Sequence, residues 1–269
     1  MKISLIATTY NRPDFLRKVL AGYLAQKRLP DEAVIADDGS GPETKDVVDD
    51  FRKKAPFPII HARQEKVGIR LSRLRNMATR ASSGEYVIYT DGDCIPGPWF
   101  IKDHERLAEP GWFVQGKRFM VQQKANEVIT GAERWPRLLM LWLSGGIKKL
   151  HHIPHIPGLA IRKKSIKGII SCNLAVWRKD IYNINGWNEK FVGFWRQDSE
   201  FALRLLLSGI RRKDALFSAV SFHLAHEKPL VQQDLARNTQ LLEDAKHGPF
   251  YVPDGIANQS DGNSDKIWK

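Results

Sequence analysis

The chain of 269 residues carries 42 Lys and Arg against 30 Asp and Glu, a formal net charge of +12, and 42% of its residues are hydrophobic. This length and apolar content suit one large domain or two closely packed lobes. Its two cysteines, Cys94 and Cys172, exclude a disulfide framework and lack the spacing of a cysteine-rich metal knuckle.

The first predicted element is the apolar run at residues 3–7, which follows directly on Met1 and Lys2. A continuous apolar run is typical of a strand covered on both faces. The run is too short for a signal-peptide core or a membrane span, so we expect a cytoplasmic protein.

Strands and helices then alternate up to Thr90. Pro13 suits the first turn of a helix, with Asn11 or Thr9 available to cap it. The alternation predicts a parallel sheet with right-handed crossovers, and such sheets bind ligands at the carboxyl ends of their strands. The further strands are expected at residues 33–36, 58–62 and 86–90, and the helices at residues 16–24, 43–54 and 71–81.

A polar cluster follows three of these strands, at residues 8–12, 37–40 and 91–93. Because the carboxyl ends of parallel strands meet at one edge of the sheet, we expect the three clusters to form one site. For Thr8 and Asp37 a purely structural role, capping a helix or a turn, remains open.

The third cluster reads Asp91-Gly92-Asp93. Alternate residues of an extended chain point to the same side, so both carboxylates can face one target, and Gly92 leaves room for an anionic ligand. Two hard oxygen donors suit Mn²⁺ or Mg²⁺ carrying a phosphate. The alternative is a polar turn, since Asp-Gly is a common turn dipeptide.

No glycine-rich loop follows the first strand, which excludes dinucleotide and P-loop sites. The motifs Thr-Thr-Tyr-Asn-Arg-Pro, Asp-Asp-Gly-Ser, Arg-Asn and Asp-Gly-Asp, in this order, resemble a family 2 glycosyltransferase of the GT-A fold. The resemblance implies an α/β fold with a Rossmann-like, mostly parallel sheet flanked by helices, and an inverting reaction on a UDP-sugar. It implies a nucleotide site in which Thr8, Tyr10 and Arg12 line the pocket, with the Tyr10 ring beside the uracil. Asp38 would accept from the uracil imide, and Arg75 would lie near the base or the diphosphate. Asp91 would contact the ribose or the sugar, and Asp93 would bind the metal.

The second half, from Ser171 to Leu205, resembles the carboxyl-terminal segment of β-1,4-galactosyltransferases, polypeptide N-acetylgalactosaminyltransferases and bacterial chondroitin-type polymerases. The resemblance makes Asp198 the catalytic base or an acceptor anchor. The chain departs from the pattern in having Trp195 and Arg196 where those families have glycines, and Gln197 where they have glutamate. The alternative is that Asp198 only starts a helix, where the dipole favours a carboxylate. Acceptor contacts are expected from Asn173, Trp187, Trp195 and Gln197. Trp187, Phe194 and Trp195 could stack on sugar rings, and at least one of these three is expected in the core.

Two histidines follow this segment, His223 and His226. In the same families a histidine here completes the metal shell, and imidazole with carboxylate and diphosphate oxygens suits Mn²⁺. His223 is the better match, with His226 as the alternative.

Residues 135–143 read most simply as a buried helix, with an acceptor lid or a membrane-surface patch as alternatives. A basic stretch up to residue 170 follows and reads as a long acceptor-binding insertion. His151, His152 and His155 lie in it, but Pro154 and Pro157 break the helix that would align them on a metal.

We expect one GT-A domain at 1–252, with a nucleotide-binding half (1–93) and an acceptor half (94–252), and a flexible tail at 253–269.

We therefore expect a metal-dependent glycosyltransferase that builds a bacterial surface polysaccharide or lipopolysaccharide. The basic surface suggests an anionic saccharide or glycolipid acceptor and peripheral contact with the inner membrane face. A sugar-nucleotide-forming nucleotidyltransferase is the alternative, although Thr8–Arg12 lacks the glycine-rich loop that it needs. A nucleic-acid-binding protein would explain the charge but would leave the carboxylates unexplained.

Overall fold

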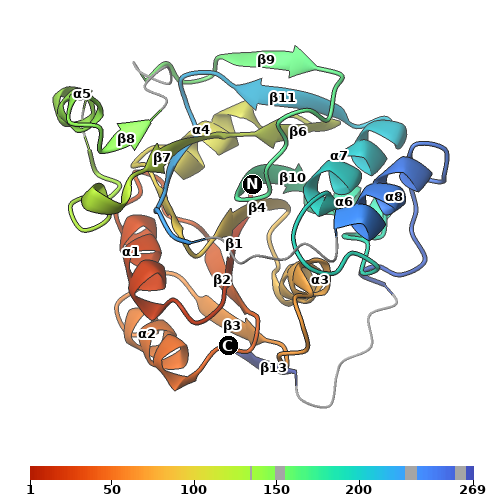
Figure 1. Cartoon of the computed structure of the whole chain (residues 1–269), viewed down its shortest axis with the longest axis horizontal. Helices are drawn as coiled ribbons and strands as arrows, with labels where there is room; N and C mark the ends of the chain where they lie inside the picture. Colours follow the sequence, from red (N-terminus) through yellow and green to blue (C-terminus); the bar gives the residue numbers. More distant parts are fainter. Residues whose placement is uncertain (134, 149–154, 228–234, 258–264) are drawn as a thin grey trace.

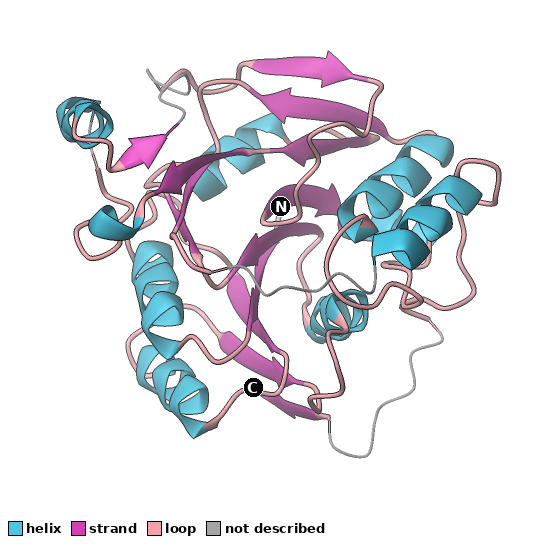
Figure 2. Cartoon of the chain, in the orientation of Figure 1, coloured by secondary structure: helices cyan, strands magenta, loops and turns pink. Residues whose placement is uncertain are grey.

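The computed structural model describes residues 1–133, 135–148, 155–227, 235–257 and 265–269. Within these residues, a nine-stranded sheet of order β13-β3-β2-β1-β4-β10-β6-β11-β9 crosses the molecule, and a four-stranded sheet of order β5-β12-β7-β8 lies beside it. Helices cover both faces of the large sheet (Figures 1 and 2). The mixed α/β architecture predicted from the sequence is confirmed.

The first four strands of the large sheet run parallel, with β1 between β2 and β4 and with β3 beside β2. Each predicted strand and helix of this half is present, displaced by a few residues at the ends. The elements are β1 (Ile3–Thr9), α1 (Pro13–Leu24), β2 (Glu32–Asp37), α2 (Pro42–Arg52), β3 (Ile59–Arg63), α3 (Leu71–Ala81) and β4 (Tyr86–Asp91).

The second half joins this sheet through β10, which runs antiparallel to β4. Its other strands extend the large sheet or form the small one. The strands are β5 (Cys94–Pro96), β6 (Trp112–Gln115), β7 (Lys117–Val121), β8 (Ile147–Lys148), β9 (Ala160–Lys163), β10 (Asn173–Trp177), β11 (Arg211–Ala215), β12 (Val220–His223) and β13 (Lys266–Trp268). The helices are α4 (Phe100–Leu107), α5 (Trp135–Leu143), α6 (Arg178–Asn183), α7 (Gln197–Leu207) and α8 (Leu235–Ala245), with a 3₁₀ turn at Gln123–Ala125.

Alternate residues of the central strands pack into two separate hydrophobic cores, one on each face of the sheet. Leu5 of β1 belongs to the core that contains residues of α1 and α2, while its neighbour Ile6 belongs to the core that contains residues of α3 and α7. Because both faces of β1 are buried, its sequence is continuously apolar rather than alternating. This explains why the strand was readable from its composition.

The start of α1 differs from the expected cap. Arg12 occupies the N-cap position without a side-chain capping bond, and Pro13 begins the helix as predicted. The Asn11 side chain instead accepts a hydrogen bond of 2.8 Å from the Gly41 N–H. Asn11 therefore ties the β1 turn to the β2 turn.

The expected loose tail is wrong for the described residues beyond 252. Strand β13 pairs antiparallel with β3, and the Trp268 ring lies 4.9 Å from the His61 ring. Asp265 forms an ion pair with Arg73 at 2.6 Å, and Ile256 is buried. The carboxyl-terminal segment is thus part of the folded unit.

Helix α5 is not the buried helix that the sequence favoured. Only Leu138 of its described side chains is buried, while Met140, Trp142 and Leu143 are 62%, 43% and 70% exposed. Among the described residues, no helix is both long enough and apolar enough to cross a bilayer. The basic insertion after α5 contains β9, which pairs with β11 at the edge of the large sheet. Of its three histidines, His151 and His152 lie outside the described residues.

Trp187 is a core residue, and the expected acceptor contact is wrong for it. Its ring is fully buried, stacks on Phe201 at 4.0 Å between centroids and meets Tyr89 edge-on at 5.3 Å. No face of the ring is left for a sugar. Trp195, eight residues later, is 56% exposed.

These two tryptophans give a matched pair for a stability measurement. Trp187→Ala removes a buried ring from a packed aromatic stack and should lower the free energy of unfolding by about 3–5 kcal/mol. Trp195→Ala should change it by less than about 1 kcal/mol, because little area is buried there. Urea denaturation of both variants checks this, and equal losses would contradict the placement of the rings.

Candidate functional site

The three polar clusters predicted at the strand ends do meet at one edge of the large sheet. The Asp38 N–H donates to the Thr9 carbonyl at 3.0 Å, and the Gly92 N–H donates to the Thr8 carbonyl at 2.7 Å. These backbone bonds fasten the β2 and β4 turns to the end of β1. We call this edge the carboxylate rim, after Asp38, Asp91 and Asp93.

Gly92 serves this junction rather than a ligand. A Cβ built on it would lie 3.0 Å from the Thr8 carbonyl oxygen and 3.1 Å from the Thr9 side chain. The space beside Gly92 is therefore filled by β1, and the expected room for an anionic ligand at this backbone is absent.

Asp91 is held between a hydroxyl and a cation. The Thr8 hydroxyl donates to Asp91 Oδ1 at 2.7 Å, and Arg75 Nη2 lies 3.6 Å from the same oxygen. Burial raises the pKa of Asp91 to about 6; Arg75 opposes this shift, and the charge of Asp93 adds to it. Asp91 is thus a partly desolvated carboxylate that gains from a cationic or hydrogen-bonding ligand.

Arg75 also joins the rim to the second half of the chain. Its Nη2 donates to the Ser171 hydroxyl at 2.6 Å, and its Nη1 lies 3.7 Å from Asp198 Oδ1. The guanidinium carbon is 4.7 Å from the centre of the Trp187 ring, and the residue is only 2% exposed. One arginine therefore positions two carboxylates that are 107 residues apart.

Asp198 lies in the first turn of α7, where a carboxylate complements the helix dipole. Its Oδ2 accepts a hydrogen bond of 3.0 Å from the Ser171 N–H, which lies outside α7. Its Oδ1 has no hydrogen-bond donor among the described residues. A purely helix-starting role leaves that oxygen and the contact with Ser171 unexplained.

Asp93 faces two imidazoles, and both histidines named from the sequence are brought to it. His226 Nε2 lies 2.8 Å and His223 Nε2 lies 3.8 Å from Asp93 Oδ2. Burial works to raise the pKa of Asp93, but the His226 hydrogen bond and both imidazoles outweigh it, so the pKa is lowered. Conversely, the Asp93 hydrogen bond raises the pKa of His226, whereas burial lowers that of His223.

This donor set fits a divalent metal ion. The Asp93 carboxylate comes from the turn between β4 and β5, the His223 imidazole from β12, and the His226 imidazole from the segment after β12. A carboxylate with two imidazoles suits Mn²⁺. The buried Nδ1 of His223 has no hydrogen-bond partner among the described residues, and its Nε2 faces Asp93. Asp93, His223 and His226 would hold the ion.

Tyr10 and Asp38 form a third group, together with a residue that the sequence reasoning missed. Lys66 lies 3.8 Å from the centre of the Tyr10 ring and donates to Asp38 Oδ2, while Gln64 donates to Asp38 Oδ1. Both Asp38 oxygens are thus engaged, and a uracil imide would have to replace one of these donors. The sequence offered no signal for this contact.

Arg12 lies apart from that group. Its guanidinium carbon is 5.4 Å from the centre of the Phe15 ring, and the Phe15 ring is 6.4 Å from that of His226. The structure therefore places Arg12 toward the Asp93 cluster rather than beside Tyr10.

The expected acceptor residues divide into two groups. Asn173 is fully buried, with its amide bonded to His104 and to the Lys117 and Ala219 carbonyls, so an acceptor contact is wrong for it. Gln197 is 6% exposed, whereas Trp195 is open to solvent.

Trp195 and Arg196 adopt consecutive left-handed conformations, with φ of 82° and 69°. Side chains other than glycine rarely adopt them, and such strain concentrates at functional loops. Asn238 of α8 holds the loop by donating to the Val192, Phe194 and Trp195 carbonyls.

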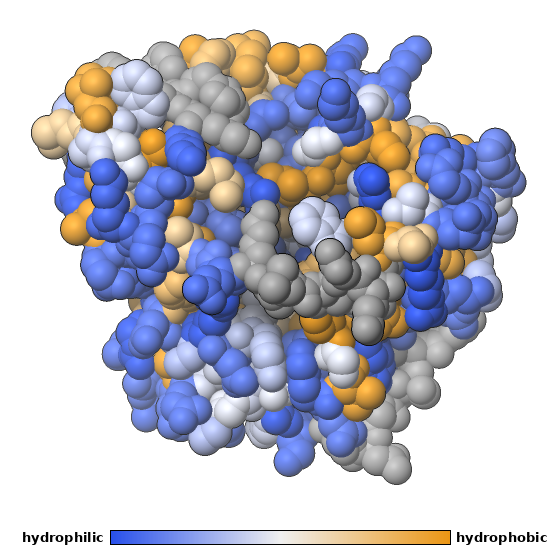
Figure 3. All heavy atoms as spheres, viewed as in Figure 1, coloured by the Kyte–Doolittle hydropathy of each residue, from blue (hydrophilic) through white to orange (hydrophobic). Residues whose placement is uncertain are grey.

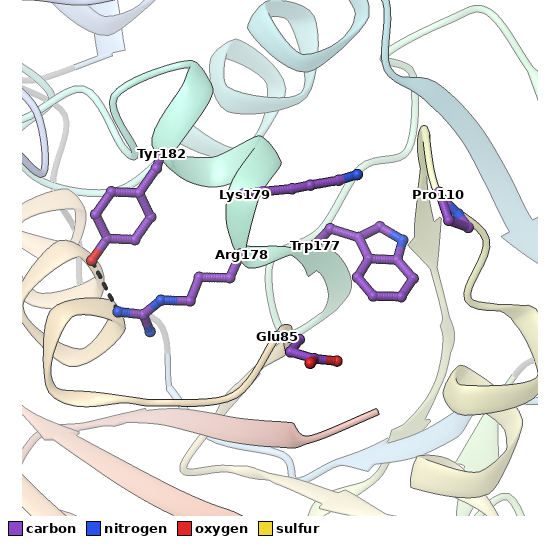
Figure 4. A pocket seen from close by; sticks show the side chains of 6 residues that line it. All are labelled: Glu85, Pro110, Trp177, Arg178, Lys179 and Tyr182. Atoms are coloured by element: carbon purple, nitrogen blue, oxygen red, sulfur yellow. Dashed lines mark hydrogen bonds between the residues drawn. The ribbon is translucent and has the colours of Figure 1, made fainter.

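Two cavities lie away from the rim. One of about 570 Å³ sits at the opposite, amino-terminal end of β4, where Arg178 reaches the Tyr182 hydroxyl (Figure 4). Another of about 550 Å³ lies under Leu138, lined by Trp99 and several phenylalanines. The second cavity is also lined by Asp103 and His155, which pair at 3.0 Å. Neither cavity is lined by Asp91, Asp93 or Asp198, and we assign the chemistry to the rim, where those carboxylates meet two imidazoles. The first cavity is lined by Glu85, Pro110, Trp177, Arg178, Lys179 and Tyr182.

Comparisons with known families agree with these observations. The model of glycosyl transferase family 2 matches residues 4–183, and a model described as the N-terminal domain of galactosyltransferase matches residues 160–227. Chondroitin synthase of Escherichia coli is 24% identical over 254 residues, covering 84% of this chain and 35% of that protein. Hyaluronan synthase of Pasteurella multocida is 32% identical over 108 residues, covering 40% of this chain and 11% of that protein. The chain thus spans about a third or less of the length of these relatives.

Solved structures share the fold. TarS 1–349 of S. aureus, in complex with UDP-GlcNAc, superposes with a TM-score of 0.67 at 17% identity, covering 91% of this chain and 66% of that one. A mannosyltransferase of Pyrobaculum calidifontis in complex with GDP-Man and Mn²⁺ gives a TM-score of 0.57 at 18% identity, covering 88% and 59%. The predicted GT-A fold is confirmed.

Proposed function

We propose, on the premise that this chain belongs to glycosyl transferase family 2, that it is a metal-dependent inverting glycosyltransferase acting on a UDP-sugar. One observation carries the proposal: two groups of side chains lie together at the carboxylate rim. Asp93 with His223 and His226 forms the first group, and Asp91 with Arg75 and Asp198 forms the second. The first group suits the diphosphate, and the second places a free carboxylate oxygen beside it.

Asp198 is the proposed general base. Its Oδ1 would take the proton of an acceptor hydroxyl while the hydroxyl oxygen attacks the anomeric carbon. The bond from that carbon to the diphosphate oxygen breaks as the new bond forms, so the configuration inverts. The Ser171 N–H fixes the other carboxylate oxygen, and Arg75 Nη1 lies 3.7 Å from Oδ1. A bound Mn²⁺ or Mg²⁺ would offset the negative charge that develops on the leaving UDP.

The nucleotide would lie across Thr8, Tyr10, Asp38 and Arg75, with Asp91 on the ribose or sugar. UDP is favoured because TarS was solved with UDP-GlcNAc. The chain carries no glycine-rich loop after β1, so we prefer sugar transfer to sugar-nucleotide formation.

The acceptor would approach past the exposed Trp195 ring, with Gln197 behind it. Chondroitin synthase and hyaluronan synthase are named for anionic polysaccharides, and a net charge of +12 suits an acceptor of that kind. A surface polysaccharide or lipopolysaccharide is therefore the proposed product class.

Helix α5 supports peripheral contact with the inner membrane face. Figure 3 shows apolar atoms over the position of α5 in Figure 1, bordered by hydrophilic ones. Met140, Trp142 and Leu143 are the exposed apolar side chains, and Lys124 donates to the Ser144 carbonyl directly after the helix. Apolar side chains beside cations suit an anionic bilayer surface.

Vesicle binding tests this surface. The chain should sediment with phosphatidylglycerol vesicles and not with phosphatidylcholine vesicles, and added salt should weaken the binding. Met140→Asp with Leu143→Asp should reduce binding about tenfold or more. Leu235→Asp, at a leucine that is 46% exposed at the start of α8, is the control. Unchanged binding of the α5 variant would refute the contact.

Asp93→Ala tests the metal site. At a ligand concentration of ~100 Kd, UDP with Mn²⁺ should stabilise the parent by ~2.7 kcal/mol, read as a rise in melting temperature. The variant should lose this Mn²⁺-dependent stabilisation and the transfer activity while its metal-free fold persists. Asp46→Ala, on the exposed face of α2, should behave as the parent. Mn²⁺-dependent transfer by Asp93→Ala would rule the site out.

Asp198→Asn separates the base from a binding residue. Asparagine keeps the size and one oxygen but removes the proton acceptor, so turnover should fall by ~10²-fold or more while UDP affinity with Mn²⁺ stays within a few-fold. Asparagine starts a helix about as well as aspartate, so a purely structural role predicts nearly unchanged turnover. Initial rates and UDP titrations of the two proteins decide between these outcomes.

A further inference from the structure

Two buried thiols from the two halves of the chain meet beside Asp91. Cys94 begins β5, Cys172 directly precedes β10, and both are free. The two sulfurs and one Asp91 oxygen all lie within 4.8 Å of one another. The proposed transfer reaction uses neither thiol.

The backbone around both sulfurs is fixed. Cys94 lies opposite His223 in the ladder of β5 and β12. Cys172 lies between Ser171, bonded to Arg75 and Asp198, and the fully buried Asn173. Arg118 Nη1 lies 3.3 Å from Cys172 Sγ and orients it. The backbone that carries the two thiols is therefore in place before any ion arrives, and the Cys94 thiol would leave its 3.2 Å contact with Asp93 Oδ1 on binding the ion.

Their chemistry differs from that of the Asp93 cluster. Thiolates are soft ligands that favour thiophilic ions such as Zn²⁺ and Cd²⁺, whereas the carboxylate and the two imidazoles of the Asp93 cluster are harder. Zn–S bonds of ~2.3 Å in a tetrahedral site place two sulfurs about 3.8 Å apart, within the spacing found here. Three protein ligands would leave a fourth position for water.

We propose that Asp91, Cys94 and Cys172 form a second metal site, selective for a thiophilic divalent cation such as Zn²⁺ or Cd²⁺. The ion enters as M²⁺ and displaces the two thiol protons, which pass to solvent. The bound ion draws Asp91 away from the Thr8 hydroxyl and from Arg75. Given the proposed function, such an ion inhibits transfer, because Asp91 is no longer available to the sugar nucleotide.

Cadmium titration of the full chain tests the site directly. Cd²⁺–thiolate bonds absorb in the ultraviolet, and the chain has only two cysteines, so any such absorption arises from them. The parent should show the absorption at one Cd²⁺ per chain. Cys94→Ser and Cys172→Ser should each weaken Cd²⁺ binding about tenfold or more and reduce the absorption, and the double variant should show none.

Two results would overturn the proposal: no thiolate absorption in the parent, or full absorption and affinity in Cys172→Ser. The latter would place the ion with Asp93, Cys94 and His223, the other triad within 4.8 Å. Melting curves in EDTA verify that each variant is folded, and Cys→Ala variants replace any serine variant that is not.

The absorption is independent of sugar transfer. Failure of every nucleotide sugar as donor would refute the proposed function and leave the cadmium result standing. If transfer is observed, Zn²⁺ added with excess Mn²⁺ should inhibit the parent more strongly than Cys172→Ser.

Discussion

The Arg75 guanidinium is a buried positive charge, and the arrangement of the rim follows from how that charge is compensated. A desolvated cation needs partners of opposite charge. Among the described residues, Arg75 has two carboxylates within 4 Å and one hydrogen bond, from Nη2, while its Nε and Nη1 make none. Asp91 comes from the first half of the chain, and Asp198 and Ser171 come from the second half. The two halves of the chain are therefore joined at the point where the proposed donor and acceptor sites meet. The Trp187 ring closes the remaining side and couples this charge to the aromatic core.

The first ninety residues could be predicted from the sequence because local patterns determine them. Strands such as β1 and β4 are buried on both faces and are continuously apolar, and Pro13 marks a helix start. The second half is less readable, since its strands are short and pair with distant partners, as β10 does with β4. The two tryptophans show the same limit. Composition identifies Trp187 and Trp195 equally, and only the tertiary packing makes one a core residue and the other a surface residue.

The site was predictable to the extent that it lies at strand ends. Parallel strands bring Thr8, Asp38 and Asp91 to one edge whatever the details of packing. Contacts that depend on side-chain reach were not predictable. Lys66 on Asp38 and Ser171 between Arg75 and Asp198 have no sequence signature, and the meeting of two cysteines 78 residues apart has none either. The conformation of Trp195 and Arg196 is a further case, because their residue types argue against the left-handed φ that both adopt.

An open sheet of nine strands has two edges, and exposed edges invite pairing with another chain. At one edge, β13 occupies the free side of β3 and is only three residues long. At the other edge, β9 carries exposed Arg162 and Lys163, whose charges oppose the approach of a like strand. A very short strand at one edge and charged side chains at the other are both features that oppose edge-to-edge association, a contribution to colloidal stability that is separate from both sugar transfer and metal binding.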